Sequence, residues 1–292
     1  MRYHLSMYFD YHVHSYFSDD SSEPMKNQIK QAINLGIEEI CFTEHVDYGI
    51  KRDFDDPRGI ETITINNEQM QLSNCDYPNY FKELHTLKEK YHNQIKIKQG
   101  LEFGVQSHTI EKYNTLFNKY QNELDFVLFS MHQVNDLQSW NQDAQRGKTQ
   151  KEYNDEYYNE ILKCIKVYKN YSVLAHLDLM TRYDLNGPYP FEYEKEIITE
   201  ILMQAIKDNK GIEVNTSSHR YKLKDTTPSK DILKLYKELG GTIITVGSDG
   251  HNAKDLGKHI KETYSLLKEL GYTHVCTFDK MKPIFHEIKE YQ

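Results

Sequence analysis

The 292-residue chain has few of the features that mark membrane, secreted or nucleic-acid-binding proteins. No apolar run approaches the roughly 18 residues that a membrane span requires. The segment from Met1 to Ser6 lacks the apolar core of a signal peptide. Lys and Arg number 36 against 44 Asp and Glu, a net charge of −8, so the basic face of a nucleic-acid binder is not expected. We therefore expect a cytoplasmic protein that binds neither membranes nor nucleic acid.

Cysteine is also scarce, and its placement excludes two further classes. The four cysteines are far apart and form no CxxC pair; they are Cys41, Cys75, Cys164 and Cys276. This spacing fits neither a zinc ribbon nor a disulfide framework, and it is typical of a reducing compartment. Hydrophobic residues make up 38% of the chain, enough for a substantial core. The length fits either two average domains or one α/β barrel, and we predict one domain over residues 1–292.

Strand and helix patterns alternate from end to end. The first predicted strand ends at residue 12. The next six cover 37–43, 95–103, 126–132, 172–176, 211–216 and 242–249. The first predicted helix begins at residue 25. Five more cover 77–93, 110–122, 151–169, 191–209 and 229–239, and a last helix precedes a short strand at 274–278. Repeated βα units imply a parallel sheet with right-handed crossovers. No glycine-rich phosphate-binding turn follows the first strand, so we favour a closed barrel over an open doubly wound sheet.

Two polar segments interrupt this pattern. Residues 46–76 are rich in Asp and Asn and are predicted to form a long loop or insertion. Residues 135–149 are predicted to form a second loop, which contains the only tryptophan, Trp140. Loops of such length are often functional, and both follow predicted strands.

Potential metal ligands stand at or just after the carboxyl ends of six predicted strands. His12 and His14 alternate with the period of a strand, so both imidazoles point to the same side. The whole set comprises His12, His14, His45, Glu102, His132, His176, Asp249 and His251, with Asp19 or Asp20 shortly after the first pair. Any one strand-end histidine is more often a hydrogen-bonded structural residue than a ligand. In a parallel barrel, however, these strand ends meet at one mouth, where active sites lie.

The donors indicate a centre with more than one metal ion. Imidazoles and carboxylates crowded together without a metal would repel when charged or lack partners when neutral. Mixed His, Asp and Glu ligation suits Zn²⁺, Mn²⁺ or Fe²⁺ without separating them. Because the donors are too many for one ion, we expect two or three divalent ions. His219 could lie at the same edge, whereas the remaining histidines are predicted to lie away from it.

Three arginines follow strands at this same edge. Arg182 and Arg220 come after the fifth and sixth predicted strands, and Arg146 lies in the loop after the fourth. A guanidinium group binds phosphate or carboxylate through two parallel hydrogen bonds. The sequence therefore predicts an anionic substrate held by Arg182, Arg220 and Arg146, although exposed arginines that bind nothing are as common.

The motifs together resemble the polymerase-and-histidinol-phosphatase (PHP) superfamily. The resemblance rests on motifs in that family's order from residue 12 to 251; they are His12-Val-His14, Thr43-Glu44-His45, Glu102, His132, His176 and Asp249-Gly-His251. Two further segments are similar to the histidinol-phosphate phosphatases of this family; they run from His176 to Arg182 and from Glu213 to Arg220. The resemblance implies a distorted (β/α)7 barrel, similar to a TIM barrel, and a trinuclear metal centre.

The resemblance also implies how the ligands divide among three ions. His12, His14, Glu102 and Asp249 would hold the first ion. Glu102 would bridge to a second ion together with His132 and His176, and Asp20, His45 and His251 would hold a third. Many family members have His in place of Asp20 and Asp in place of Glu44. We also predict that Glu102, Asp249 and His251 take part in catalysis.

The implied activity is hydrolysis of a phosphate monoester. A hydroxide bridging two ions would attack phosphorus in line, because coordination lowers the pKa of bound water toward about 7. The leading hypothesis is a histidinol-phosphatase that converts L-histidinol phosphate to L-histidinol and phosphate in histidine biosynthesis. The same site could act on a sugar phosphate, a nucleotide, a phosphotyrosine or a DNA end. An alternative of another class is a metal-binding domain without catalytic activity.

Overall fold

The centre of the protein is a seven-stranded sheet in which every neighbouring pair is parallel. The computed structural model describes residues 7–65 and 68–289. The strand order is β1-β2-β5-β6-β9-β10-β11. These strands are β1 (Tyr8–Val13), β2 (Ile37–Val46), β5 (Lys96–Gly104), β6 (Phe126–Ser130), β9 (Val173–Leu174), β10 (Gly211–Asn215) and β11 (Ile244–Gly247).

The two outer strands of this sheet approach each other and nearly close it. Val13 at the end of β1 forms a parallel bridge with Gly250, and the amide of His14 donates to the Gly250 carbonyl at 3.0 Å. The buried Asp10 carboxylate in β1 accepts hydrogen bonds from the Ser248 amide at 2.8 Å and the Gly257 amide at 3.0 Å. The predicted seven-stranded barrel is confirmed, and the open doubly wound alternative is wrong.

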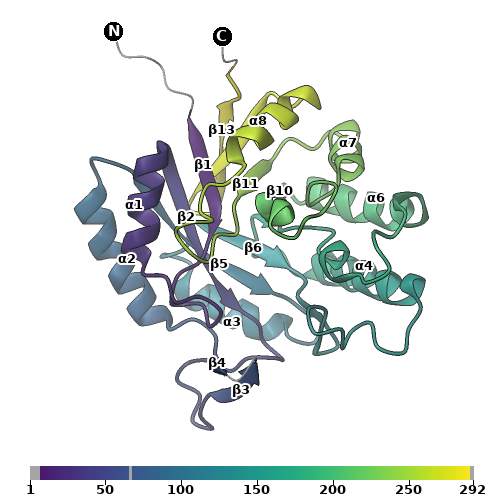
Figure 1. Ribbon diagram of the computed structural model, residues 1–292, viewed down its shortest axis with the longest axis horizontal. Coiled ribbons are helices and arrows are strands. Elements are labelled where there is room, and N and C mark those ends of the chain that lie inside the picture. Colours follow the sequence, from purple (N-terminus) through teal and green to yellow (C-terminus); the bar gives the residue numbers. More distant parts are fainter. Residues whose placement is uncertain (1–6, 66–67, 290–292) are drawn as a thin grey trace.

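Helices surround the strands, with α1, α2 and α3 on one side and α4, α6 and α7 on the other (Figure 1). The helices are α1 (Met25–Leu35), α2 (Tyr77–Tyr91), α3 (Ile110–Tyr120), α4 (Gln150–Val167), α5 (Met180–Tyr183), α6 (Phe191–Lys207), α7 (Lys230–Glu238) and α8 (Ile260–Glu269), with one 3₁₀ turn, η1 (Thr216–His219). Every residue of β1, β6, β10 and β11 is buried, as expected for parallel strands covered by helices. In the described part of the chain, no helix combines the length and apolar character needed to traverse a bilayer.

Three short antiparallel pairs lie outside the barrel. Residues 46–76 are not a plain loop, because β3 (Glu61–Ile65) and β4 (Glu68–Leu72) pair within them and project from the body of the protein (Figure 1). The second predicted loop contains β7 (Gln133–Val134) and β8 (Leu137–Gln138), and a C-terminal hairpin consists of β12 (His274–Asp279) and β13 (Lys282–Glu287). The sequence interpretation of residues 46–76 as aperiodic is wrong, because apolar and polar residues alternate in both strands, with Ile63 and Ile65 in the first and Met70 and Leu72 in the second.

Candidate metal centre

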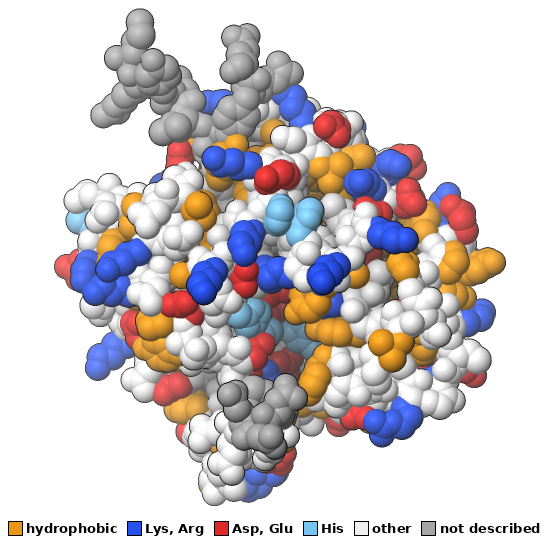
Figure 2. Space-filling view, viewed as in Figure 1, with side chains coloured by type: hydrophobic (Ala, Val, Ile, Leu, Met, Phe, Trp, Pro, Cys, Tyr) orange, Lys and Arg blue, Asp and Glu red, His pale blue; other side chains and the backbone are white. Residues whose placement is uncertain are grey.

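A cavity of about 260 Å³ opens at the carboxyl edge of the barrel strands. Figure 2 shows histidine and acidic side chains gathered in a hollow of this face. The predicted site residues that line the cavity are Asp20, His45, Glu102, His132, His176, Arg182, Asp249 and His251. Of the predicted metal ligands, His12 and His14 do not line it; they are fully buried beneath it and contact Glu102.

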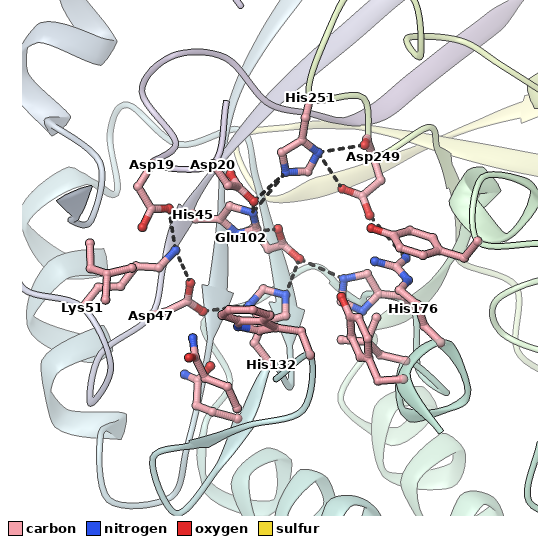
Figure 3. A pocket seen from close by; sticks show the side chains of 18 residues that line it. Asp19, Asp20, His45, Asp47, Lys51, Glu102, His132, His176, Asp249 and His251 are labelled. Atoms are coloured by element: carbon pink, nitrogen blue, oxygen red, sulfur yellow. Dashed lines mark hydrogen bonds and ion pairs between the residues drawn. The ribbon is translucent and has the colours of Figure 1, made fainter. Parts of the chain in front are cut away.

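Glu102 stands at the centre of the cluster, near the end of β5 (Figure 3). Its Oε1 lies 3.1 Å from His132 Nε2 and 3.0 Å from His176 Nε2. Its Oε2 lies 3.1 Å from His12 Nε2 and 3.3 Å from His14 Nε2. Burial would raise the pKa of Glu102, but the surrounding imidazoles outweigh burial and hold this pKa well below its usual range. The carboxylate is therefore ionised, with its two oxygens facing two different sets of imidazoles.

Asp249 belongs with His12 and His14, the imidazoles that face Glu102 Oε2. Its Oδ1 lies 3.5 Å from both His12 Nε2 and His14 Nε2. Asp249 has a φ of 54°, a left-handed backbone conformation that is uncommon for any residue other than glycine. His176 also has a positive φ, of 26°. Such strained conformations concentrate at functional sites, where the surrounding structure holds them in place.

A third set of donors lies nearer the surface. Asp20 Oδ2 lies 3.1 Å from His251 Nε2 and 3.4 Å from His45 Nε2, and these two imidazole nitrogens are 3.4 Å apart. The neighbouring Asp19 instead pairs with Lys51, whose Nζ lies 2.7 Å from Asp19 Oδ1. Of the two carboxylates that the sequence left open, Asp20 is the one that faces the imidazoles.

The donor atoms suit divalent metal ions. Among residues 7–65 and 68–289, four groups have ligand atoms within 4.8 Å of one another; they are His14–His45–His251, His12–Glu102–His176, His12–His14–Asp249 and His45–Glu102–His132. The separations of 3.0 to 3.5 Å described above match the about 3.3 Å between ligands of a tetrahedral ion whose bonds are about 2.0–2.1 Å. Imidazole and carboxylate ligands together are typical of Zn²⁺, Mn²⁺ and Fe²⁺.

His14 provides a direct test of this fit. Its Nε2 is buried and has no hydrogen-bond partner. Its ring stacks against both His45 and His251, with centroids 4.2 Å and 4.1 Å away. Burial and the two neighbouring imidazoles lower the pKa of His14 to about 4. The neutral ring therefore presents an unpartnered lone pair to the cluster, as a metal ligand requires.

Residues that sequence reasoning did not select orient three of the imidazoles. Glu213 Oε1 lies 2.5 Å from His12 Nδ1, and Asp47 Oδ1 lies 2.7 Å from His132 Nδ1. Ser18 Oγ lies 3.0 Å from His14 Nδ1. Each contact occupies the far ring nitrogen, so that Nε2 is directed into the cluster, as the outer partners of metal ligands usually do.

Two of these partners carried a weak signal in the sequence. Glu213 lies in the segment that resembles the phosphatases, and Asp47 follows His45 by two residues. Gly247 of β11 packs directly against the first pair, because a Cβ atom there would lie 2.3 Å from His12 Cβ and 2.7 Å from Glu213 Oε1. A glycine inside the predicted strand 242–249 could therefore have pointed to a crowded position.

Glu44 supports the loop after β1 and makes no contact with the donor sets. It accepts hydrogen bonds from the Ser15 and Ser18 hydroxyls, both at 2.6 Å, and from the Ser15 amide at 3.1 Å. Ser18 in turn contacts His14, as described above. Burial raises the pKa of Glu44 to about 7. Glu44, which stands where many family members have Asp, therefore contacts the loop that carries Asp20 and not the donor sets.

Of the three arginines predicted to bind substrate, the structure brings only Arg182 into the cavity. Arg220 donates to the backbone carbonyls of Ser248 at 3.0 Å and Asp249 at 2.7 Å and does not line the cavity. Arg146 is 76% exposed and pairs with Asp143 at 2.7 Å. Arg220 thus holds the loop that carries Asp249, and Arg146 lies on the surface.

His219 is likewise outside the cavity. Its ring stacks on His259 with a centroid separation of 3.8 Å. The four cysteines are all buried and unpaired in the structure.

Comparisons with known proteins agree with this geometry. A histidinol-phosphatase from Lactococcus lactis is 34% identical over 283 residues, which cover 94% of this chain and 95% of that protein. A histidinol-phosphatase from Bacillus subtilis is 23% identical over 85% of this chain and 95% of its own length. A solved structure of the Lactococcus lactis histidinol phosphate phosphatase, complexed with Zn, L-histidinol and phosphate, superposes with a TM-score of 0.78 at 32% identity. It covers 95% of this chain and 98% of its own.

A second solved structure, from Listeria monocytogenes, shares the fold at 19% identity with a TM-score of 0.68. It covers 87% of this chain and 99% of its own. The family model of the PHP domain matches residues 10–217, more than half of the chain. The chain belongs to the PHP domain family.

Proposed function

We propose that this protein is a metal-dependent phosphomonoesterase that hydrolyses L-histidinol phosphate to L-histidinol and phosphate. The observation that carries the proposal is the meeting of three donor sets around Glu102 in a cavity that Arg182 also lines. The similarity to the Lactococcus lactis histidinol-phosphatase over nearly the full length of both chains supports the substrate. We also propose that residues 1–292 work as one PHP metallophosphatase domain, in the cytoplasm and in histidine biosynthesis.

The donor sets support three divalent ions. We propose that the ligands of the first ion are His12, His14, Glu102 and Asp249, those of the second Glu102, His132 and His176, and those of the third Asp20, His45 and His251. Zn²⁺ is the first candidate because the Lactococcus lactis structure contains it, and Mn²⁺ and Fe²⁺ prefer the same ligands. Such ions supply a hydroxide at neutral pH and offset the negative charge of a phosphoryl group.

Arg182 is the side chain best placed to bind the phosphoryl oxygens. Its Nη2 donates to Ser217 Oγ at 2.5 Å and lies 3.5 Å from Asp249 Oδ2. Its guanidinium lies 4.1 Å from the ring centroid of Tyr221, which holds it in place. Its Nε is buried without a hydrogen-bond partner. This donor is therefore free to bind a phosphoryl oxygen and to stabilise charge that develops during the reaction.

The cavity walls suit the organic part of the substrate. Trp140, Tyr183 and Tyr221 line it and offer aromatic surface for an imidazole ring. Asp19 Oδ2 is buried without a hydrogen-bond partner, and Asp19 also lines the cavity. This oxygen could accept a hydrogen bond from the ammonium group of an amino alcohol. A plain sugar phosphate would leave it unpaired.

Turnover by the metal-loaded protein tests the proposal. L-Histidinol phosphate would be compared with a sugar phosphate, a nucleotide, phosphotyrosine, a DNA 3′-phosphate and an aryl phosphate, alongside metal analysis. We expect kcat/KM for L-histidinol phosphate to exceed that of the others at least about 10- to 100-fold, because buried polar groups would otherwise stay unpaired. A preference for another ester would overturn the substrate assignment. Bound metal without turnover of any ester would favour the non-catalytic alternative.

A further inference from the structure

A second cavity, of about 250 Å³, lies on the side of the barrel that α4, α6 and α7 cover (Figure 1). Its acidic lining residues are Asp178, Glu194, Asp225 and Asp231. Its apolar lining includes Tyr158, Tyr189, Pro190, Phe191 and Ile198. One basic residue, Lys224, also lines it. The cavity therefore combines an excess of carboxylates with aromatic and aliphatic walls.

Two of these carboxylates are buried and incompletely paired. Glu194 is 4% exposed, and its Oε1 has no hydrogen-bond partner. Asp178 is 6% exposed; its Oδ2 accepts from the Ser229 amide at 2.8 Å, while its Oδ1 has no partner. By contrast, Asp225 accepts from the Thr226 amide at 2.8 Å, and Asp231 lies 3.4 Å from Lys234 Nζ. The two unpaired oxygens are thus confined to the most buried carboxylates.

Leaving a buried carboxylate oxygen unpaired is costly, more so if the group is ionised. Burial and the nearby charges of Asp155, Asp178 and Asp184 raise the pKa of Glu194 to about 8. A cation bound in the cavity that both residues line would pair with the free oxygens of Glu194 and Asp178 and remove this cost. The cavity therefore has the electrostatic character of a cation site whose occupant is not part of the chain.

The size and walls of the cavity select among cations. A bare metal ion would leave most of about 250 Å³ unfilled, since one water takes about 30 Å³. Aromatic and apolar side chains are typical of sites for organic ligands, with a few polar groups that fix their orientation. We propose that this cavity binds a small organic cation, a primary ammonium group joined to an apolar or aromatic body, with Glu194 and Asp178 as its acceptors.

This site is separate from the metal centre. Thr181 lines the second cavity, whereas its neighbour Arg182 lines the first. Similarly, Tyr221 lines the first cavity and Leu223 the second. The two cavities share these segments as walls but have no lining residue in common. The inference consequently does not depend on the proposed phosphatase activity.

Calorimetric binding of 2-phenylethylamine to the zinc-loaded, full-length protein tests the inference. The matched neutral probe is 2-phenylethanol, and the matched variants are Glu194→Gln, Asp178→Asn and Asp231→Asn. We expect the amine to bind more tightly than the alcohol and Glu194→Gln to weaken amine binding about 10- to 100-fold, as for loss of a charged hydrogen-bond acceptor. Asp231→Asn should change the affinity less than about twofold, because Asp231 already has Lys234 as a partner.

Several outcomes would overturn the site. These are equal binding of amine and alcohol, unchanged amine affinity in Glu194→Gln, or replacement of the amine by Mg²⁺ or Ca²⁺ in a Glu194-dependent manner. Far-UV circular dichroism, measured on each variant, reports whether the protein is folded. If Glu194→Gln does not fold, Asp178→Asn replaces it as the test, with the same expected loss. Failure of the phosphatase assay alone would leave the amine measurement intact.

Discussion

The metal-donor cluster and the second cavity both contain buried carboxylates, yet these carboxylates have opposite acidities. In the cluster, imidazoles hold the pKa values of Glu102 and Asp249 well below their usual range in spite of burial. In the second cavity, burial raises the pKa of Glu194 to about 8 and that of Asp178 to about 7. Burial is common to all four groups. The difference shows that partners, rather than depth, decide which buried carboxylates are ionised.

The source of the partners explains the difference. Around Glu102, five strands of one barrel edge deliver histidines whose nitrogens lie within 3.5 Å of a carboxylate. Around Glu194, burial and the charges of Asp155, Asp178 and Asp184 raise its pKa, and the charge of Lys151 opposes them. The first region therefore holds ionised carboxylates beside its imidazoles, whereas Glu194 in the second region is largely protonated near neutral pH.

The largest effect is expected from removing the carboxylate that all three donor sets surround. We expect Glu102→Gln to lose bound metal and to lower kcat/KM at least about 10³-fold, more than the roughly 10–100-fold typical of outer partners. The measurements are metal content by mass spectrometry and turnover of L-histidinol phosphate. Glu194→Gln is the matched control, since it changes a carboxylate that is equally buried. Equal losses in both variants would show that the loss of any buried carboxylate, and not the loss of the imidazole partners of Glu102, causes the effect.

Arg182 lines the cavity of the metal-donor cluster and not the second cavity, and replacing it is expected to have the next largest effect. We expect Arg182→Ala to lower kcat/KM about 10²-fold, because a preorganised donor to the phosphoryl group is lost. Metal content should stay close to that of the unmodified protein. Arg146→Ala, which changes an exposed arginine, is the control and should alter kcat/KM less than about twofold. Similar kinetics for the two variants would contradict the placement of Arg182 on the substrate.

The variant Glu213→Gln tests whether a residue that contacts a proposed metal ligand, without binding metal itself, contributes to metal affinity. Glu213 contacts His12 Nδ1, so Glu213→Gln should weaken metal binding about 10- to 100-fold while leaving the ligands themselves in place. Competition with a chelator measures this affinity, and added metal should restore most of the turnover. Turnover that excess metal fails to restore would place Glu213 in the chemistry instead of in ligand orientation.

The smallest effect concerns stability and pH in the second cavity. The folded pKa of Glu194, about 8, exceeds the about 4.3 of an unfolded glutamic acid, so between these values only the folded chain keeps the proton. The resulting stabilisation is complete below about pH 4 and is lost as pH rises through about 8, by at most about 1.4 kcal/mol per pH unit. The charges that act on this group come from Lys151 and Asp155 of α4 and from Asp178 and Asp184.

Urea unfolding of the original protein and of Glu194→Gln between pH 5.5 and 8 measures this contribution. The difference in free energy of unfolding between the two should fall steadily as pH rises. Metal ligands titrate equally in both proteins, so their contribution cancels in the difference. A difference independent of pH would mean that Glu194 is ionised when folded, like Glu102.

Much of the fold could be predicted because it depends on local patterns. The alternation of strands and helices reflects periodicities within about ten residues, and these gave the seven barrel strands in order. The end of β2 was placed too early, since the strand continues through Glu44 and His45 to Val46. Polar residues inside a buried strand hide its end when their partners are not known. The β3–β4 hairpin was missed because its short alternating strands lie in a segment that is otherwise polar.

The candidate site was predictable in its composition but not in its contacts. That donors at strand ends would meet at one edge follows from the parallel barrel. Whether Asp19 or Asp20 faces the imidazoles depends on Lys51, which holds Asp19. The Arg220 guanidinium is engaged by carbonyls of the loop after β11, and Arg146 lies on the surface. Neither arrangement has a signature in the neighbouring sequence.

By itself, the sequence determined the barrel, the order of its strands and the gathering of histidines and carboxylates at their carboxyl ends. Those properties follow from short-range periodicity and from the direction of parallel strands. Only the tertiary structure decided the partner of each polar group, as in the contact of His12 with Glu213, 201 residues away. It also decided that Glu102 is surrounded by imidazoles whereas Glu194 is left unpaired. The ionisation of a buried carboxylate depends on atoms within a few ångströms, and folding brings those atoms from distant parts of the chain.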